Sequence, residues 1–295
     1  MSRPGFSESV LVDAAWTMQH LTSPQVRIVE VDMDNAAYAD GHLQGAVAWS
    51  WSTQLTDPVR RDIPSRESLS ALLRSSGIGP ETTVVLYGSS NNWFATWAYW
   101  LLKMHGHADV RMLDGGRRYW TDHMLPIASE IPVPQPTTYE LPEPDQSIRI
   151  LRDEVISRLG EDGLVLVDVR SLAENSGEVI APPGMTETAQ RGGHIPGAVL
   201  VPMTAVLRPD GTFKKASDLR DLYESRGVTP DQKVVTYCRI GERSSHSWFV
   251  LHELLGYPEV RNYDGSWTEW GSMIGVPIER ESAFDEESIA VPAAD

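Results

Sequence analysis

The chain has 295 residues, of which 41% are hydrophobic, and it carries a formal net charge of -16 at pH 7. This length fits two domains of roughly 140 residues each, and the apolar content excludes a disordered chain. The negative charge disfavours nucleic acid and anionic membranes as partners.

The distribution of apolar residues and the cysteine count bear on the compartment. No apolar run approaches the roughly 20 residues that cross a bilayer, and the N-terminus lacks an apolar signal core. The single cysteine, Cys238, excludes an internal disulfide, and a lone thiol stays reduced most easily inside the cell. We therefore expect a cytoplasmic protein with no membrane partner.

The sequence contains an internal repeat. A shift of 150 residues aligns 15 residues with identical residues of the second half, without a gap. In the first half these are Leu69, Leu72, Ser75, Gly77, Pro80, Val84, Val85, Tyr87, Leu101, Gly106, Val110, Arg111, Asp114, Gly115 and Trp120. The repeat predicts two copies of one fold, in domains spanning residues 1–130 and 147–295.

Upstream of this repeat, each half has a predicted strand that ends in aspartate and then a Gly-His turn. Asp32 precedes His42 by 10 residues, whereas Asp168 precedes His194 by 26. The second half therefore carries an insertion, around residues 178–191, which is either a surface loop or a flap over the substrate.

Residues 131–146 join the two halves. Five prolines fall between positions 132 and 144. Proline fixes φ and lacks an N–H, so a helix or a central strand is disfavoured here. We predict a stiff, extended linker that holds the halves in a set relation.

The second half shows short apolar runs that alternate with helical patterns. Strands are predicted at 164–168, 199–201, 233–237 and 260–263, and helices at 153–159, 217–226 and 244–255. This alternation predicts a largely parallel sheet covered on both faces, with ligands bound at the carboxyl ends of its strands. Cys238 follows such an end, and the first half has Gly88 at the matching position.

The residues around Cys238 suit a cysteine nucleophile. A thiol with an ordinary pKa of about 8.5 is mostly protonated at neutral pH, but a loop with inward N–H groups and a following helix start favours an anion. Arg239 and Arg243 can pair with a sulfonate or a carboxylate. We predict that Cys238 is catalytic and that the substrate is bound by Arg239, Ile240, Gly241, Glu242, Arg243 and Ser244.

Four motifs of the second half carry a resemblance to a known family: Asp168-Val169-Arg170, Gly-His-Ile-Pro-Gly-Ala at 193–198, Cys-Arg-Ile-Gly-Glu-Arg at 238–243 and Asp-Gly-Ser-Trp at 264–267. With a first half that lacks the cysteine, they resemble the tandem rhodanese family of sulfurtransferases over essentially the whole chain. The resemblance implies an α/β fold of two rhodanese-like domains, each a mainly parallel sheet flanked by helices on both faces.

The resemblance also implies an activity. Such an enzyme moves the sulfane sulfur of thiosulfate to the cysteine as a persulfide, and then to cyanide or to a thiol, which can belong to a protein. No cofactor and no metal are implied. We expect Asp168 and Arg170 to support the loops at the sheet edge. Animal thiosulfate-using members tend to have Arg-Lys after the cysteine, and this chain matches them at Arg239 but has Ile240 in place of the lysine. It also has Glu174 where those members have a further arginine.

Other functions stay open from the sequence. An enzyme that uses 3-mercaptopyruvate as the donor is the nearest alternative, and a non-enzymatic sulfur carrier that binds partner proteins is an alternative of another class. A phosphatase or arsenate reductase fits less well, because their loops place five residues between cysteine and arginine. Here four residues separate Cys238 from Arg243.

Overall fold

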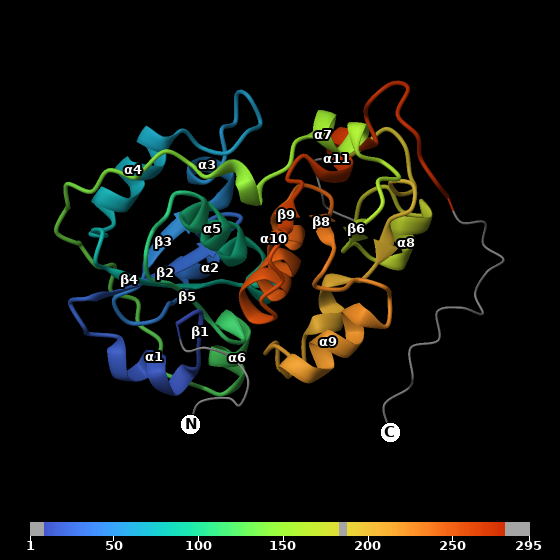
Figure 1. Ribbon diagram of the computed structural model, residues 1–295. Coiled ribbons are helices and arrows are strands. Elements are labelled where there is room, and N and C mark those ends of the chain that lie inside the picture. Colours follow the sequence, from blue (N-terminus) through green and yellow to red (C-terminus); the bar gives the residue numbers. More distant parts are fainter. Residues whose placement is uncertain (1–8, 183–187, 281–295) are drawn as a thin grey trace.

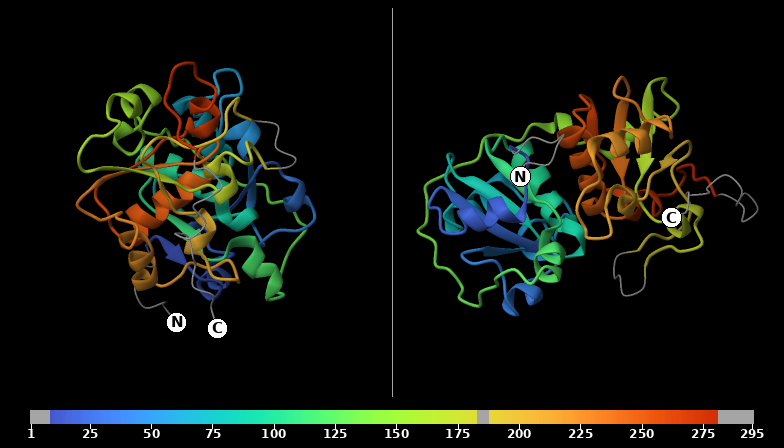
Figure 2. Two further views of the ribbon diagram at one scale, coloured as in Figure 1. Left: turned by 90° about the vertical axis from the view of Figure 1, so that its right-hand side faces the viewer. Right: turned by 90° about the horizontal axis from the view of Figure 1, so that it is seen from below.

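The computed structural model describes residues 9–182 and 188–280. They form two α/β halves that lie side by side, with the first half coloured from blue to green and the second from yellow-green to red (Figures 1 and 2). Residues 131–145, which are all described, contain no helix or strand and run along the first half as the linker. Within the described part of the chain, no helix is long and apolar enough to span a membrane.

The first half is built on a parallel five-stranded sheet with the order β1-β5-β4-β2-β3. Apolar side chains of β4 point alternately into two separate core clusters: Val84 and Leu86 into one, Val85 and Tyr87 into the other. Both faces of the sheet are therefore covered, which explains the continuous apolar runs of its strands. The strands are β1 (Leu11–Val12), β2 (Val26–Asp32), β3 (Val47–Ser50), β4 (Thr83–Tyr87) and β5 (Val110–Leu113). The helices are α1 (Ala14–His20), α2 (Ala36–Ala39), α3 (Trp51–Gln54), α4 (Arg66–Ser75), η1 (Ser90–Asn92), α5 (Trp93–Met104) and α6 (Gly116–Asp122).

The second half repeats this plan with a parallel four-stranded sheet of order β7-β6-β8-β9. An isolated parallel bridge between Arg149 and Asn262 takes the place of the fifth strand. The strands are β6 (Leu164–Asp168), β7 (Val199–Leu200), β8 (Lys233–Tyr237) and β9 (Val260–Asn262). The helices are η2 (Gln146–Ile148), α7 (Arg152–Ser157), α8 (Leu172–Ser176), η3 (Met203–Val206), α9 (Ala216–Glu224), α10 (Glu242–Trp248), its π-helical continuation η4 (Phe249–Leu254) and α11 (Ser266–Trp270).

This architecture confirms the predicted fold class, and it shifts some boundaries. The strands predicted at 164–168 and 233–237 have the same bounds in the structure, whereas the helix predicted from residue 244 begins two residues earlier, at Glu242. Helix α8 was not predicted, although Ser171 and Glu174 form a capping box at its start. Of the 178–191 insertion, residues 183–187 lie outside the described residues.

The two halves share a hydrophobic core. Helices α5 and α10 face each other at the junction, and a single core cluster includes Trp97 and Trp100 from the first half and Trp248 and Phe249 from the second (Figure 1). The ring of Tyr99 packs edge-on against Phe249, with 4.8 Å between ring centroids. The halves are thus fixed against each other by apolar packing.

Each half also sends a hairpin toward the other. In the first half, an antiparallel bridge joins Asp57 to Asp62, and in the second a corresponding bridge joins Leu207 to Phe213. Arg61 of the first hairpin bonds to the hydroxyl of Thr268 in the second half. In return, the backbone N–H of Phe213 donates to Asp114 of the first half at 2.9 Å. We call these two segments the exchanged hairpins.

Candidate active site

Cys238 lies directly after the C-terminal end of β8, at the junction between the halves. Its side chain is fully buried, and its Sγ accepts a hydrogen bond from the backbone N–H of Gly241 at 3.1 Å. The backbone N–H of Cys238 donates to Ser266 Oγ at 3.0 Å, and its carbonyl accepts from the N–H of Trp267 at 3.1 Å. The Cys loop, residues 238–243, is therefore fastened to the start of α11 and curls around the sulfur.

Gly241 lets this loop pass close to the first half. Its φ is 103°, and a Cβ here would lie 2.6 Å from the Trp97 side chain and 3.0 Å from the Cα of Asp264. A larger residue would clash on both sides and would need a strained backbone. The hydroxyl of Ser244 lies 2.9 Å from the Gly241 carbonyl oxygen and 2.6 Å from Asn262 Oδ1. Ser244, which the sequence predicted to bind substrate, thus bonds to the Cys loop and to β9, and it stabilises the turn at Gly241.

The surroundings of Cys238 favour the protonated thiol. Burial raises the pKa of Cys238 above its usual value, and the nearby Glu242 carboxylate raises it further. Arg243 and the backbone N–H groups of the loop lower the pKa, but they do not offset burial. The sequence suggested that the loop would hold a preformed thiolate, whereas burial and the Glu242 carboxylate raise the pKa of Cys238 and so favour the thiol.

Arg243 is paired with a residue that the sequence marked as a departure from the family pattern. Its two terminal nitrogens donate to the two carboxylate oxygens of Glu174 at 2.8 and 2.9 Å, and both side chains are buried. The guanidinium lies over the Trp93 ring, 5.6 Å from its centroid. A donor anion would have to displace this ion pair to bind Arg243, so the part of Arg243 in donor binding stays a prediction. The capping box of Ser171 and Glu174 is a sequence signal for the start of α8, but it does not indicate that Glu174 faces Arg243.

Asp168 and Arg170 form a second ion pair, fully buried at the end of β6. Arg170 donates to the Gly193 carbonyl at 2.8 Å and stacks on Trp267, and the Tyr237 hydroxyl donates to Asp168 at 3.0 Å. Tyr237 directly precedes Cys238, and the backbone N–H of Trp267 donates to the Cys238 carbonyl. This geometry supports the proposal that the pair braces the loop.

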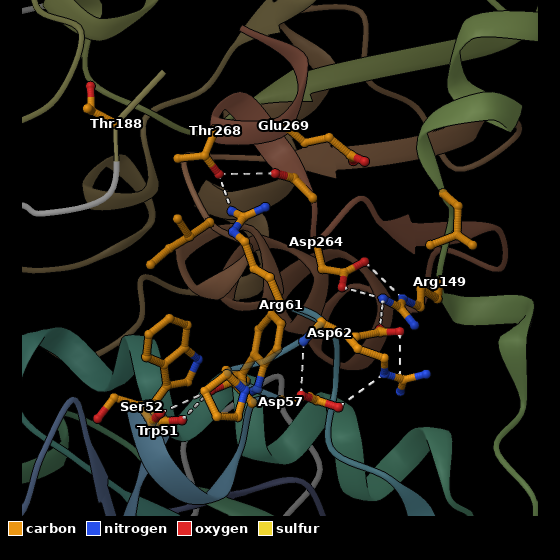
Figure 3. A pocket seen from close by; sticks show the side chains of 17 residues that line it. Trp51, Ser52, Asp57, Arg61, Asp62, Arg149, Thr188, Asp264, Thr268 and Glu269 are labelled. Carbon is orange, nitrogen blue, oxygen red and sulfur yellow. Dashed lines mark hydrogen bonds and ion pairs between the residues drawn. The ribbon is translucent and has the colours of Figure 1, made fainter. Parts of the chain in front are cut away.

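A cleft of about 810 Å³ lies between the halves beside the Cys loop (Figure 3). Trp51, Arg61, Asp62 and Trp97 line it from the first half, and Ile240, Asp264, Gly265 and Thr268 from the second. Among the described residues, the cleft wall includes Ile240 but not Cys238, so the sulfur lies behind the loop. The predicted residue Ile240 therefore marks where the loop meets the cleft.

The part of the cleft next to the Cys loop is polar. Arg149 bridges Asp264, at 2.9 and 2.7 Å, and Asp62, at 2.7 Å. The hydroxyl of Thr268 donates to the carbonyl of Arg239 at 3.0 Å, and Figure 3 shows Arg61 reaching Thr268. Sequence reasoning missed Arg61, Arg149 and Trp51, and we find no sequence signal for them. The side chain of Arg239, a predicted substrate contact, is buried.

The first half has no room for a second nucleophile. A Cβ at Gly88 would lie 2.2 Å from the carbonyl oxygen of Val31. The Asn92 side chain closes the loop instead, accepting from the Gly88 N–H and donating to the Leu113 carbonyl, both at 2.9 Å. Only glycine fits at position 88 without a shift of the neighbouring backbone.

We predict that Gly88→Cys creates no second reaction centre. The added side chain should cost about 1–3 kcal/mol of unfolding free energy, measured by urea denaturation, because it overpacks a filled site. The double variant Gly88→Cys/Cys238→Ser should transfer no more sulfur than Cys238→Ser alone. Sulfur transfer by the double variant above that control would contradict the prediction.

Comparisons with known proteins identify the family of the chain. The rhodanese-like domain family matches residues 13–123 and 151–273. A Haloferax volcanii protein, provisionally named a thiosulfate sulfurtransferase, is 49% identical over 285 residues, which cover 95% of this chain and 99% of the relative. The sulfur carrier protein TtuD of Thermus thermophilus is 50% identical over 273 residues, 91% of this chain and 96% of that protein.

A solved structure is also similar. The anaerobic ergothioneine biosynthesis enzyme of Chlorobium limicola, in complex with trimethyl histidine, superimposes with a TM-score of 0.81 at 28% identity, covering 93% of this chain and 71% of that one. The same fold occurs twice in the chain, and only the second copy has a cysteine loop at a strand end. Relatives are about 50% identical over more than 90% of the chain. The chain belongs to the rhodanese-like domain family, with two such domains, and is a sulfurtransferase of that family.

Proposed function

We propose that the protein transfers the sulfane sulfur of thiosulfate to cyanide or a thiol through a persulfide on Cys238. The observation that carries this proposal is the position of Cys238 Sγ, enclosed by the Cys loop and receiving the Gly241 N–H at 3.1 Å. An inward N–H group stabilises negative charge on sulfur, either as a thiolate or as the terminal sulfur of a persulfide. The cleft lies beside the loop and is lined by Ile240, so a donor or an acceptor bound there would be next to the Cys loop.

The proposed cycle has two displacements. The Cys238 thiolate attacks the outer sulfur of thiosulfate, the sulfur–sulfur bond of the donor breaks, and sulfite leaves with the bonding electron pair. The acceptor, as cyanide or a thiolate, then attacks the outer sulfur of the persulfide, and Cys238 leaves as the thiolate. The products are thiocyanate or a new persulfide, and no external oxidant or reductant is consumed.

Thiosulfate is favoured over 3-mercaptopyruvate as the donor by the provisional name of the Haloferax relative and by arginine at position 239. We predict that kcat/KM for thiosulfate exceeds that for 3-mercaptopyruvate by at least about tenfold, a difference of about 1.4 kcal/mol between transition states. Steady-state assays with each donor, at one fixed cyanide concentration, measure the ratio. A higher kcat/KM with 3-mercaptopyruvate would assign the protein to the other donor class.

A role as a sulfur carrier is the second candidate, because the TtuD relative, at 50% identity, is named a sulfur carrier protein. The two functions differ in how the persulfide forms. Incubation with thiosulfate alone, followed by intact-protein mass spectrometry, should show a species heavier by one sulfur atom if the protein is the proposed enzyme. Loading that requires a persulfidated donor protein would support the carrier instead.

A further inference from the structure

A buried carboxylate faces the reactive sulfur. Glu242, the first residue of α10, is only 2% exposed. The Cys238 thiol donates to its Oε2, with 3.5 Å between sulfur and oxygen. A carboxylate that is removed from water and lies in contact with a thiol is placed to receive the proton of that thiol.

The neighbouring arginine does not form a close pair with this carboxylate. Arg243 directs both terminal nitrogens to Glu174, and its Nε lies 3.8 Å from Glu242 Oε1. Arg243 and Glu174 therefore balance each other in charge, which leaves Glu242 with the thiol. Among the described residues, charged groups near the Cys loop include Arg239 of the loop, the Asp168–Arg170 pair at the end of β6, and Asp264 with its partner Arg149. Arg149 also pairs with Asp62, Arg61 bonds to Thr268, and the titratable side chain of His246 is buried in α10.

We propose that Glu242 is a catalytic residue that accepts the proton of the Cys238 thiol and returns it when the cysteine is released; this inference rests on the proposed sulfur transfer. The proton passes from Sγ to Glu242 Oε2, and the thiolate left on Cys238 attacks the outer sulfur of the donor. Sulfite leaves, and Glu242 stays protonated beside the persulfide. After the acceptor has taken the outer sulfur, the Cys238 thiolate recovers the proton from Glu242.

This transfer also changes where the negative charge lies. Before it, the charge is on the buried Glu242 carboxylate, and the sulfur is neutral. After it, the carboxyl group is neutral and the charge is on the nucleophile, so the total charge of the site is unchanged. The protein therefore gains a thiolate without adding a second negative charge in a buried place, where an unpaired charge is costly.

The test is the pH dependence of persulfide formation in Glu242→Gln. In the wild type, internal proton transfer should make the rate nearly independent of pH between about pH 6 and 8, above the ordinary pKa of a carboxyl group and below that of a thiol. In the variant, the proton has to leave to solvent. Its rate should therefore rise about tenfold per pH unit over this range and recover at alkaline pH. A variant that keeps the flat profile would overturn the proposal.

Alkylation by iodoacetamide is a second measurement, independent of donor binding. Because Cys238 is the only cysteine of the chain, every alkylated thiol reports on this site. The alkylation rate should show the same flat profile in the wild type and the same slope in Glu242→Gln. A wild type that is alkylated in this way but gains no sulfur from thiosulfate would refute the proposed function and leave the role of Glu242 supported.

Two controls keep the test decisive. Glu253→Gln removes a carboxylate of η4 that contacts Tyr99 of α5 and the neighbouring His252. The pH profiles of persulfide formation and of alkylation should stay as in the wild type. If Glu242→Gln fails to fold, the ultraviolet difference spectrum between wild type and Cys238→Ser measures thiolate directly. A rate that stays flat while the thiolate signal rises with pH supports the proposal, and a rate that follows the thiolate signal overturns it.

Discussion

Replacing Cys238 with serine is expected to lower sulfur transfer by about 10⁶-fold, or to the detection limit, as when other enzymes lose their nucleophile. A serine hydroxyl ionises far less readily than a thiol and cannot form a persulfide. The chain contains no other cysteine that could replace it. Thiocyanate formation from thiosulfate and cyanide measures the rate, and intact mass after thiosulfate treatment shows whether sulfur is bound.

The serine variant should remain folded. Its hydroxyl is smaller than the thiol and can still donate to Glu242, so we expect the unfolding free energy to stay within about 1–2 kcal/mol of the wild type. Loss of activity with the unfolding transition retained then reports on chemistry rather than on folding. Turnover at the wild-type rate, or a sulfur adduct on the serine variant, would refute the assignment of Cys238.

Removing the partner of Arg243 is expected to have the largest effect on stability. Glu174→Ala leaves a buried guanidinium without its carboxylate, which typically costs about 3–5 kcal/mol, a large part of the stability of an ordinary domain. Urea denaturation at pH 7 measures the loss. The double variant Glu174→Ala/Arg243→Met should recover much of it, because both charges are then gone.

Glu143→Ala is a matched control for this effect. Glu143 pairs with Arg66 at 3.2 Å, but its side chain is 79% exposed, so its loss should cost less than about 1 kcal/mol. A loss of similar size in Glu174→Ala would contradict the view that the buried pair supports the fold.

The same pair gives the stability a defined pH dependence. Burial by itself would raise the pKa of Glu174, but the hydrogen bonds and charge of Arg243 outweigh it and hold the pKa at about 2, below the ordinary 4.5. A lowered pKa in the folded state stabilises the protein above the unfolded-state pKa. The difference in unfolding free energy between wild type and Glu174→Ala should therefore shrink as the pH falls from about 4.5 toward 2.

The sequence predicted well those features that depend on neighbouring residues. The strands at 164–168 and 233–237 were found because continuous apolar runs are typical of strands covered on both faces. The position of Cys238 at a strand end followed from the same pattern. The early start of α10 was missed because Glu242 and Arg243 are polar, yet both are buried at the site.

The sequence predicted poorly those features that depend on how the halves meet. The repeat aligns residues within each half, but it does not show which residues of one half face the other. Arg61 and Trp51 reach the cleft because of the exchanged hairpins and the packing of α5 on α10. Glu174, which stands where animal thiosulfate-using members have arginine, pairs with Arg243 in the structure, and the sequence did not indicate this contact.

The exchanged hairpins bear on how such a duplicated protein can change. The half without the nucleophile forms part of the cleft wall through residues 57, 58 and 60–62, so under the proposed function selection on the donor or the acceptor acts on both copies of the repeat. Deleting the first half would open the cleft and expose the packed face of α10. A library intended to alter substrate choice therefore belongs in residues 57–62, in a domain that carries no cysteine.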